Sequence, residues 1–135
     1  MDVGAYSAEL VETLESLTKA MTEALKRGDK LGVARFYADN ALLTDLNTFG
    51  RQGRAAIDAH WTSLPSCKDW RLEVLETGGD SETPYQRLKS TLVLNIGGKE
   101  VHDIGYCFVI WKRQPDGAYR IYVDVYRPIT ESSTA

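Results

Sequence analysis

The chain has 135 residues, a length that fits one domain with a substantial buried core. Its 43% hydrophobic and 26% charged residues are ordinary for a globular domain and argue against long disordered segments. The 16 Lys and Arg are scattered among 19 Asp and Glu, and the net charge of -3 disfavours nucleic acid and anionic membranes as partners.

The cysteines and the chain ends bear on compartment and domain limits. Cys67 and Cys107 are the two cysteines, and neither lies in a CxxC pair or at metal-ligand spacing from a histidine, which predicts reduced thiols. Residues 1–6 lack the basic and apolar parts of a signal peptide, and no segment reaches the ~18 apolar residues of a membrane span. We therefore expect a cytoplasmic protein that forms one domain over residues 1–135, with an ordered core at about 7–128.

Helical periodicity predicts a first helix with an apolar face that runs from Leu10 to Leu25. Ser7 is placed to cap the start of this helix, and Gly28 is placed to end it. Another helix is expected over Arg54–Leu64, where the following proline stops it.

A shorter helix is expected between these two. Asp29 would cap it, and Leu31, Ala34 and Tyr37 would form one stripe along it. The turn-prone pair Asp39-Asn40 would end it.

Alternating apolar and polar residues, with glycine-rich turns between them, predict strands in the rest of the chain. The expected strands are Ala41–Asp45, Trp70–Thr77, Tyr85–Ile96, Lys99–Lys112 and Tyr119–Tyr126. A loop at Asn47–Gly53 would follow the first of them. Because the helices come first and most strands later, we predict an α+β fold whose last four strands form an antiparallel meander.

The segment Ile104–Trp111 predicts a strand that is apolar on both faces. Phe108 and Ile110 alternate with Val109 and Trp111, so each face needs cover from water. Helices can cover one face, and a second copy of the same sheet is the simplest cover for the other. We therefore expect a homodimer.

Two parts of the sequence resemble a known superfamily. They are Phe36–Ala41, continued at Gly53–Ile57, and Trp111–Ile121, continued at Asp124–Tyr126. They resemble the SnoaL-like families of the nuclear transport factor 2-like superfamily, especially a branch with a W-K-R-x-x-D-G-x-W-[KR]-I-x-x-D-x-[WY] ending. The resemblance covers nearly the whole chain and implies a cone-shaped, curved antiparallel sheet packed on three N-terminal helices around a pocket, the cystatin-like roll. The superfamily includes isomerases, cyclases, dehydratases, epoxide hydrolases, binding modules and kinase association domains, so the resemblance implies no single function.

Asp45 and Asp124 are the candidates for a catalytic carboxylate. Asp45 closes the first predicted strand, where ketosteroid isomerases of this superfamily have a general base; the alternative is an ordinary turn residue. The catalytic tyrosine of those isomerases would fall at Met21, which cannot donate a hydrogen bond, so steroid-type isomerisation is disfavoured. Asp124 shares an expected strand face with Tyr122 and Tyr126, where burial would raise its pKa; the alternative is a structural carboxylate.

Further residues are candidates for binding. The aromatic candidates for lining a pocket are Tyr37, Trp61, Tyr106, Trp111, Tyr122 and Tyr126, of which about half are expected to be plain core. Arg51 and Arg54 could receive an anionic ligand at a helix start, with a solvated surface role as the alternative.

The histidines are the remaining candidates. His60 and His102 are too few for a three-ligand metal site, and no HExxH pattern occurs, so no metal or other cofactor is expected. His102 is a candidate for ligand binding, and with Asp103 it could form a base and its orienting partner. Adjacent strand residues point to opposite faces, however, which favours separate roles for the two.

Three functions stay open at this point. The first is a dimeric carrier or sensor that binds a small apolar or aromatic molecule. The second is a cofactor-free isomerase, cyclase or dehydratase that uses Asp124 or Asp45 as acid or base. The third is a structural association module. Binding is favoured, because the sequence does not show the complete acid, base and donor set of a known relative.

Overall fold

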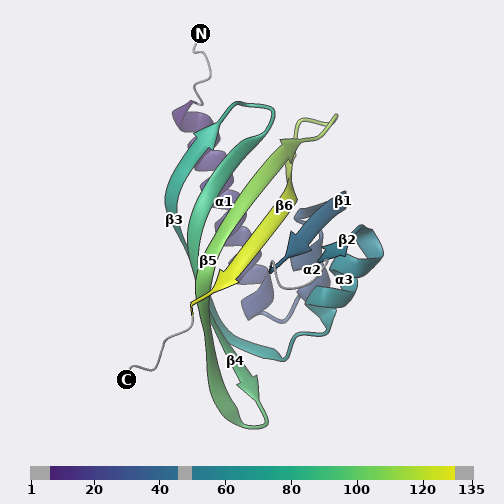
Figure 1. The fold of residues 1–135 in the computed structure, drawn as a ribbon, viewed down its shortest axis with the longest axis vertical. Helices are drawn as coiled ribbons and strands as arrows, with labels where there is room; N and C mark the ends of the chain where they lie inside the picture. Colours follow the sequence, from purple (N-terminus) through teal and green to yellow (C-terminus); the bar gives the residue numbers. More distant parts are fainter. Residues whose placement is uncertain (1–6, 46–49, 130–135) are drawn as a thin grey trace.

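A computed structural model of the chain describes residues 7–45 and 50–129 (Figure 1). The helices are α1 (Ala8–Lys26), α2 (Lys30–Ala34) and α3 (Arg54–Thr62). The strands are β1 (Tyr37–Thr44), β2 (Arg51–Gln52), β3 (Ser66–Gly79), β4 (Pro84–Ile96), β5 (Lys99–Arg113) and β6 (Tyr119–Pro128). Within the described residues the strands form one sheet in the order β2-β1-β6-β5-β4-β3. The predicted α+β fold is confirmed.

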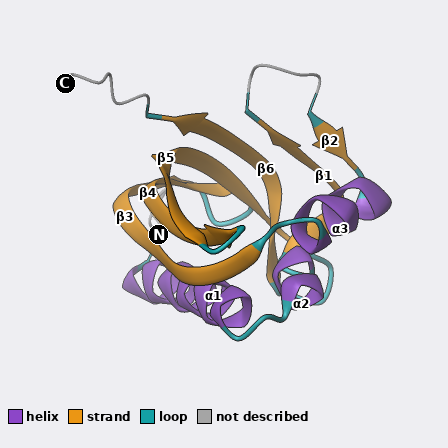
Figure 2. Ribbon diagram, turned by 90° about the horizontal axis from the view of Figure 1, so that it is seen from below, coloured by secondary structure: helices purple, strands orange, loops and turns teal. Residues whose placement is uncertain are grey.

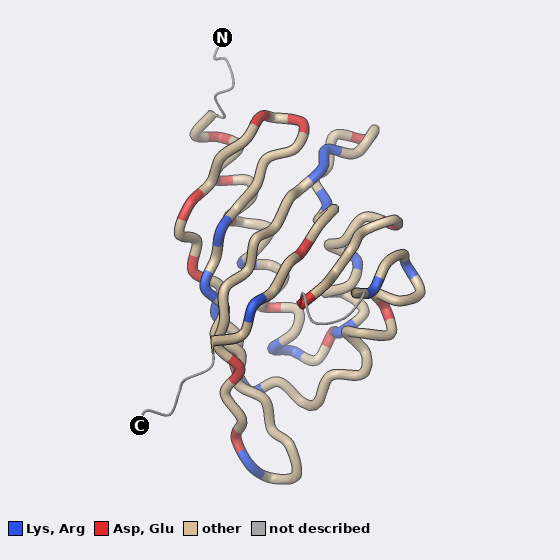
Figure 3. Tube along the Cα trace, in the orientation of Figure 1, with Lys and Arg blue, Asp and Glu red and all other residues tan. Residues whose placement is uncertain are grey.

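The sheet is strongly curved, and the helices lie on its concave side (Figure 2). Helix α1 packs along β3, and α3 packs on β1 at the other end of the sheet. The inner face of the sheet, which carries Val109 and Trp111, therefore meets the helices, and the outer face, which carries Phe108, does not. Figure 3 shows Lys and Arg positions interspersed with Asp and Glu positions along the described part of the trace.

Helix α1 follows its predicted pattern. The Ser7 hydroxyl accepts a hydrogen bond from the backbone N–H of Leu10 at 3.1 Å, which caps the first turn. Leu10, Leu14 and Leu25 are buried against the sheet, as the periodicity predicts. None of the described helices is both long and apolar enough to cross a membrane.

Helix α2 is shorter than predicted, and this changes the place of Tyr37. Asp29 caps the helix by accepting from the N–H of Gly32 at 3.0 Å, but the helix ends at Ala34 and Tyr37 begins β1. The expected stripe through Leu31 and Tyr37 is wrong, since Leu31 is 43% exposed and Tyr37 is buried. The backbone N–H of Ile121 donates to the carbonyl of Phe36, so pairing with β6 replaces helix continuation.

Strand β1 also differs from the prediction in length and direction. The turn-prone pair Asp39-Asn40 lies inside β1, where the register with β6 shifts between Tyr37 and Leu42. Strand β1 pairs with β6 in parallel, whereas β3 to β6 form the predicted antiparallel meander. Of the predicted loop at Asn47–Gly53, residues 47–49 lie outside the described residues and Arg51–Gln52 form β2.

The core fills the space between the inner face and the helices. Among its most deeply buried side chains are Leu14, Leu25, Ile57, Trp111 and Ile121. Because α1, α3 and the curved sheet all contribute to this core, the polar side chains embedded in it are removed from water.

Candidate functional site

The hydroxyl of Tyr37 donates a hydrogen bond to Asp124 Oδ2 at 2.6 Å. Both side chains are buried, with 1% of Tyr37 and 8% of Asp124 exposed. The parallel pairing of β1 with β6 produces this contact, because Tyr37 at the start of β1 lies opposite Ile121, three residues before Asp124. The two strands thus place an acid and a hydroxyl donor together inside the domain.

Burial controls the ionisation of both groups. It raises the pKa of Asp124 from 3.8 to about 6, although the hydrogen bond from Tyr37 acts in the opposite direction. Burial, and then the charge of Asp124, raise the pKa of Tyr37 well above its ordinary value. Tyr37 therefore remains a hydrogen-bond donor at neutral pH. Asp124, with a pKa of about 6, changes its charge close to neutral pH.

The position of Tyr122 relative to Asp124 on β6 differs from the prediction. The register between β5 and β6 shifts next to Tyr122, so strict alternation fails there. Tyr122 lies against Lys112, whose Nζ is 4.8 Å from the centre of its ring, and not beside Asp124. The expectation that Tyr122 and Asp124 share a face is therefore wrong.

Gln86 is a buried polar residue that the sequence analysis did not single out. Its Oε1 accepts a hydrogen bond from the indole Nε1 of Trp111 at 2.9 Å, and the Gln86 side chain is 0% exposed. In the part of the chain that the structure describes, Gln86 Nε2 and Asp124 Oδ1 are buried without a hydrogen-bond partner. Gln86 alternates in step with Leu88 and Leu92 on the mostly apolar face of β4, and a glutamine at such a position is the signal that could have identified it.

These two atoms belong to residues that line one internal cavity between α1 and the inner face. Tyr37 and Cys107 line it as well, together with Met21, Leu88 and Val109. The cavity offers about 20 Å³ to the centre of a water-sized sphere, which is enough for one water molecule. Met21 is the position at which the resemblance placed an isomerase tyrosine, and the hydroxyl donor of this chain comes instead from Tyr37 on β1.

A second tyrosine–aspartate pair lies beside the first. The hydroxyl of Tyr126 donates to Asp103 Oδ1 at 2.6 Å. Gly105 makes this possible, because a Cβ there would lie 2.5 Å from both the Tyr126 ring and the carbonyl of Arg127. Burial, then the nearby Asp124 and Asp103, raise the pKa of the Cys107 thiol, which keeps it protonated.

The histidines do not contribute to this site. His102 is on the exposed part of β5, with Nε2 3.3 Å from Glu100 Oε1, while Asp103 pairs with Tyr126. The possible His102–Asp103 pair is therefore not formed. Burial and Arg51 lower the pKa of His60 to about 4, and its ring lies edge-on to Trp61.

The other predicted residues have separate locations. Asp45 directly follows β1 and is half-buried. Trp61 and Trp111 belong to the core, with the Trp61 ring 6.1 Å from that of Tyr37. Tyr106 is 48% exposed on the outer face and does not line the cavity.

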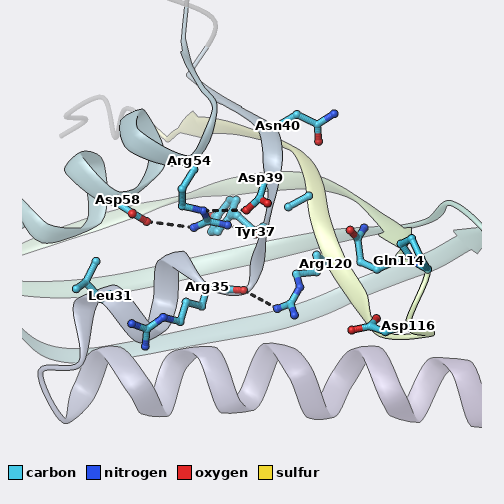
Figure 4. A pocket seen from close by; sticks show the side chains of 12 residues that line it. Leu31, Arg35, Tyr37, Asp39, Asn40, Arg54, Asp58, Gln114, Asp116 and Arg120 are labelled. Carbon is cyan, nitrogen blue, oxygen red and sulfur yellow. Dashed lines mark hydrogen bonds and ion pairs between the residues drawn. The ribbon is translucent and has the colours of Figure 1, made fainter.

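A surface cleft of about 710 Å³ lies between α2, α3, β1 and the turn before β6 (Figure 4). Arg54 lies in this cleft, where its guanidinium donates to the carbonyls of Ala34 and Tyr37 and pairs with Asp39 and Asp58. These bonds use Arg54 to join α3 to α2 and β1, a structural role that differs both from the anion binding and from the solvated surface role expected for it. Among the described residues no group of three or more His, Cys, Asp or Glu is arranged to hold a metal ion.

Several proteins of known structure are similar to this chain in fold. No protein-family model matches the sequence, and no curated protein does. A nuclear transport factor 2-like protein with a cystatin-like fold from Novosphingobium aromaticivorans matches with TM-score 0.74 and 17% identity, over 94% of this chain and 88% of that one. A ketosteroid isomerase-like protein from Erwinia carotovora matches with TM-score 0.77 and 16% identity, over 92% and 99%.

A third similar structure is described as a calcium/calmodulin-dependent protein kinase II association domain from Xanthomonas campestris. It matches with TM-score 0.73 and 19% identity, over 94% of this chain and 91% of that one. At these identities the similarities establish the fold alone. The chain has the nuclear transport factor 2-like, cystatin-like fold that the resemblance implied.

Proposed function

We propose that this protein binds a small apolar or aromatic molecule inside the curved sheet and holds a polar group of that molecule at Asp124. The observation that carries the proposal is the buried, unpartnered Oδ1 of Asp124 in a residue that lines the cavity. A buried carboxylate oxygen without a partner is costly, and a ligand hydroxyl or N–H would satisfy it. The Trp111–Tyr126 ending also resembles that of the SnoaL-like families, whose superfamily includes binding modules.

The ligand would have to enlarge the cavity. Sites for small molecules usually have about 300–1,000 Å³, far more than one water. Met21 is the flexible side chain best suited to move. A surface groove between α1 and β3 shares Thr18, Trp70 and Leu72 with the cavity lining, so we expect the ligand to enter where these three side chains separate the two spaces.

Proton transfer at the same site is the second candidate. Asp124, with a pKa of about 6, could exchange a proton with a bound substrate near neutral pH, and Tyr37 could stabilise negative charge on the carboxylate or substrate. This set supports a cofactor-free isomerase, cyclase or dehydratase.

We also propose a homodimer formed through the outer face. On that face Tyr106 and Phe108 are 48% and 38% exposed, and Ile104, Ile110 and Val125 extend the apolar surface in register with them. A second copy of the same face would cover these side chains. If the protein binds no ligand, formation of this dimer would be its function, as in an association module.

Asp124→Asn tests the site, because asparagine preserves the shape and the acceptor for Tyr37 but removes the charge. We expect the variant to fold and to bind ligands with a hydroxyl or N–H group more weakly by roughly tenfold, measured by NMR titration. The matched control is Asp39→Asn, an exposed aspartate on the neighbouring strand β1. Equal loss in both variants, or none in either, would contradict a ligand contact at Asp124.

A further inference from the structure

The orientation of the Gln86 amide is determined by its partner. An indole N–H can only donate, so the Gln86 atom that lies 2.9 Å from Trp111 Nε1 is the amide oxygen. The amide nitrogen is then the atom left without a partner, and its residue lines the cavity. Gln86 therefore offers the cavity a hydrogen-bond donor.

Asp124 offers the cavity a hydrogen-bond acceptor. Tyr37 donates to Oδ2, which leaves Oδ1 as an acceptor whenever the carboxyl is ionised. A donor and an acceptor thus belong to the lining of the same cavity, each in a side chain more than nine-tenths buried.

The sheet register sets the spacing of these two groups. Gln86 on β4 lies opposite Val109 on β5, and Val109 lies opposite Asp124 on β6. The backbones of Gln86 and Asp124 are therefore two strand spacings apart, roughly 10 Å. Val109 between them and Leu88 beside them are apolar, so these two side chains offer no hydrogen bond to a ligand that spans the two polar groups.

We infer that the ligand is an apolar or aromatic hydroxy-carbonyl compound, with its carbonyl oxygen at Gln86 Nε2 and its hydroxyl at Asp124 Oδ1. This inference rests on the proposed function and adds the chemical class of the ligand. An apolar body between the two polar groups would lie over Val109. A ligand with two donors would leave Gln86 unsatisfied, and a ligand with two acceptors would leave Asp124 unsatisfied.

Three probes of nearly equal size separate the two contacts. Para-hydroxyacetophenone has both groups, para-ethylphenol lacks the carbonyl oxygen, and para-methoxyacetophenone lacks the hydroxyl proton. Affinities would be measured by NMR titration of the full chain near pH 7, where most of Asp124 is ionised and the phenols, including the more acidic para-acetyl phenol, are mostly neutral. We expect the unmodified protein to bind para-hydroxyacetophenone roughly tenfold more tightly than either of the others.

Two variants should remove these preferences one at a time. Gln86→Met should remove the advantage of para-hydroxyacetophenone over para-ethylphenol and keep its advantage over the methyl ether. Asp124→Asn should remove the advantage of para-hydroxyacetophenone over the methyl ether and keep its advantage over para-ethylphenol. Ser90→Ala is the matched control. It removes the hydroxyl that accepts a hydrogen bond from Trp70 Nε1 at 2.9 Å, just as Gln86→Met removes the acceptor of Trp111 Nε1. Ser90→Ala should retain both preferences.

Equal affinities of the three probes for the unmodified protein would overturn the hydroxy-carbonyl assignment and leave the binding proposal standing. The assignment would also fail if Ser90→Ala erased a preference as fully as Gln86→Met does. If none of the three probes shifted signals of Met21, Leu88 or Val109, both the assignment and the proposed binding function would be overturned.

Discussion

Tyr37 and Asp124 are 87 positions apart in the sequence and are joined by a 2.6 Å hydrogen bond inside the core. The bond depends on two features of the backbone: the early end of α2 and the parallel pairing of β1 with β6. Among the described residues it gives the buried carboxylate one hydrogen-bond partner and leaves the second oxygen of this cavity-lining residue without one.

Tyr37→Phe should destabilise the protein by about 1–3 kcal/mol, because Asp124 Oδ2 loses its donor in a buried position. The pKa of Asp124 should rise further above about 6, since the tyrosine bond is what lowers it. Urea unfolding at two pH values checks this, and the loss should be larger at pH 8 than at pH 5, where more of the carboxyl is protonated. Tyr126→Phe removes the same hydroxyl from the pair with Asp103 and is the matched control.

Asp124→Asn should change the pH dependence of stability in a defined direction. The pKa of Asp124 is 3.8 when unperturbed and about 6 in the folded protein, so the folded state binds more protons between these values. Ionisation of Asp124 therefore lowers the free energy of unfolding as the pH rises from about 4 to about 6, by up to about 3 kcal/mol. The variant lacks this loss. Its free energy of unfolding, minus that of the unmodified protein, should therefore increase from about pH 4 to about pH 6 and then level off. A difference that does not vary with pH would show that Asp124 is not desolvated.

Phe108→Glu should convert the proposed dimer to a monomer, because it places a charge in the centre of the apolar outer face. Sedimentation velocity measures the result. Leu31→Glu is the control, since Leu31 is similarly exposed, at 43% against 38%, but lies on α2. A monomeric unmodified protein, or a dimer that survives Phe108→Glu, would contradict the proposed interface.

Arg54→Lys should destabilise the fold by about 1–3 kcal/mol, because lysine cannot reproduce the fork that binds the carbonyls of Ala34 and Tyr37. Arg51→Lys, at an exposed position on β2, should change stability by less than about 0.5 kcal/mol. Thermal unfolding of both variants checks this. Equally small effects would mean that the fork of hydrogen bonds from Arg54 to these two carbonyls adds nothing to stability.

The hydrophobic pattern was enough to predict α1, the meander and the fold class, because each depends on local periodicity and turn chemistry. The place of Tyr37 was not predictable in this way, since helix α2 and strand β1 compete for it and the long-range pairing with β6 decides. The bulge that turns Tyr122 away from Asp124 depends on register, which alternation alone does not reveal.

The candidate site was predicted in part. Asp124 was identified because a carboxylate in an apolar strand is unusual, and the structure buries it. Its partner Tyr37 was predicted to line a pocket, but the hydrogen bond between them was not. Gln86 was missed, although its alternation with Leu88 and Leu92 hinted at burial, because its partner Trp111 lies on the adjacent strand and the pairing is not visible in the sequence.

The most direct test of the ligand site is an NMR titration of the side-chain carboxyl carbon of Asp124 against pH, with and without para-hydroxyacetophenone. We predict a pKa of about 6 in the free protein and a different value when the probe is bound, because the probe would contact Oδ1. A pKa near the ordinary 3.8, unchanged by the probe, would show that Asp124 is neither desolvated nor in contact with a ligand, and would contradict the proposed function.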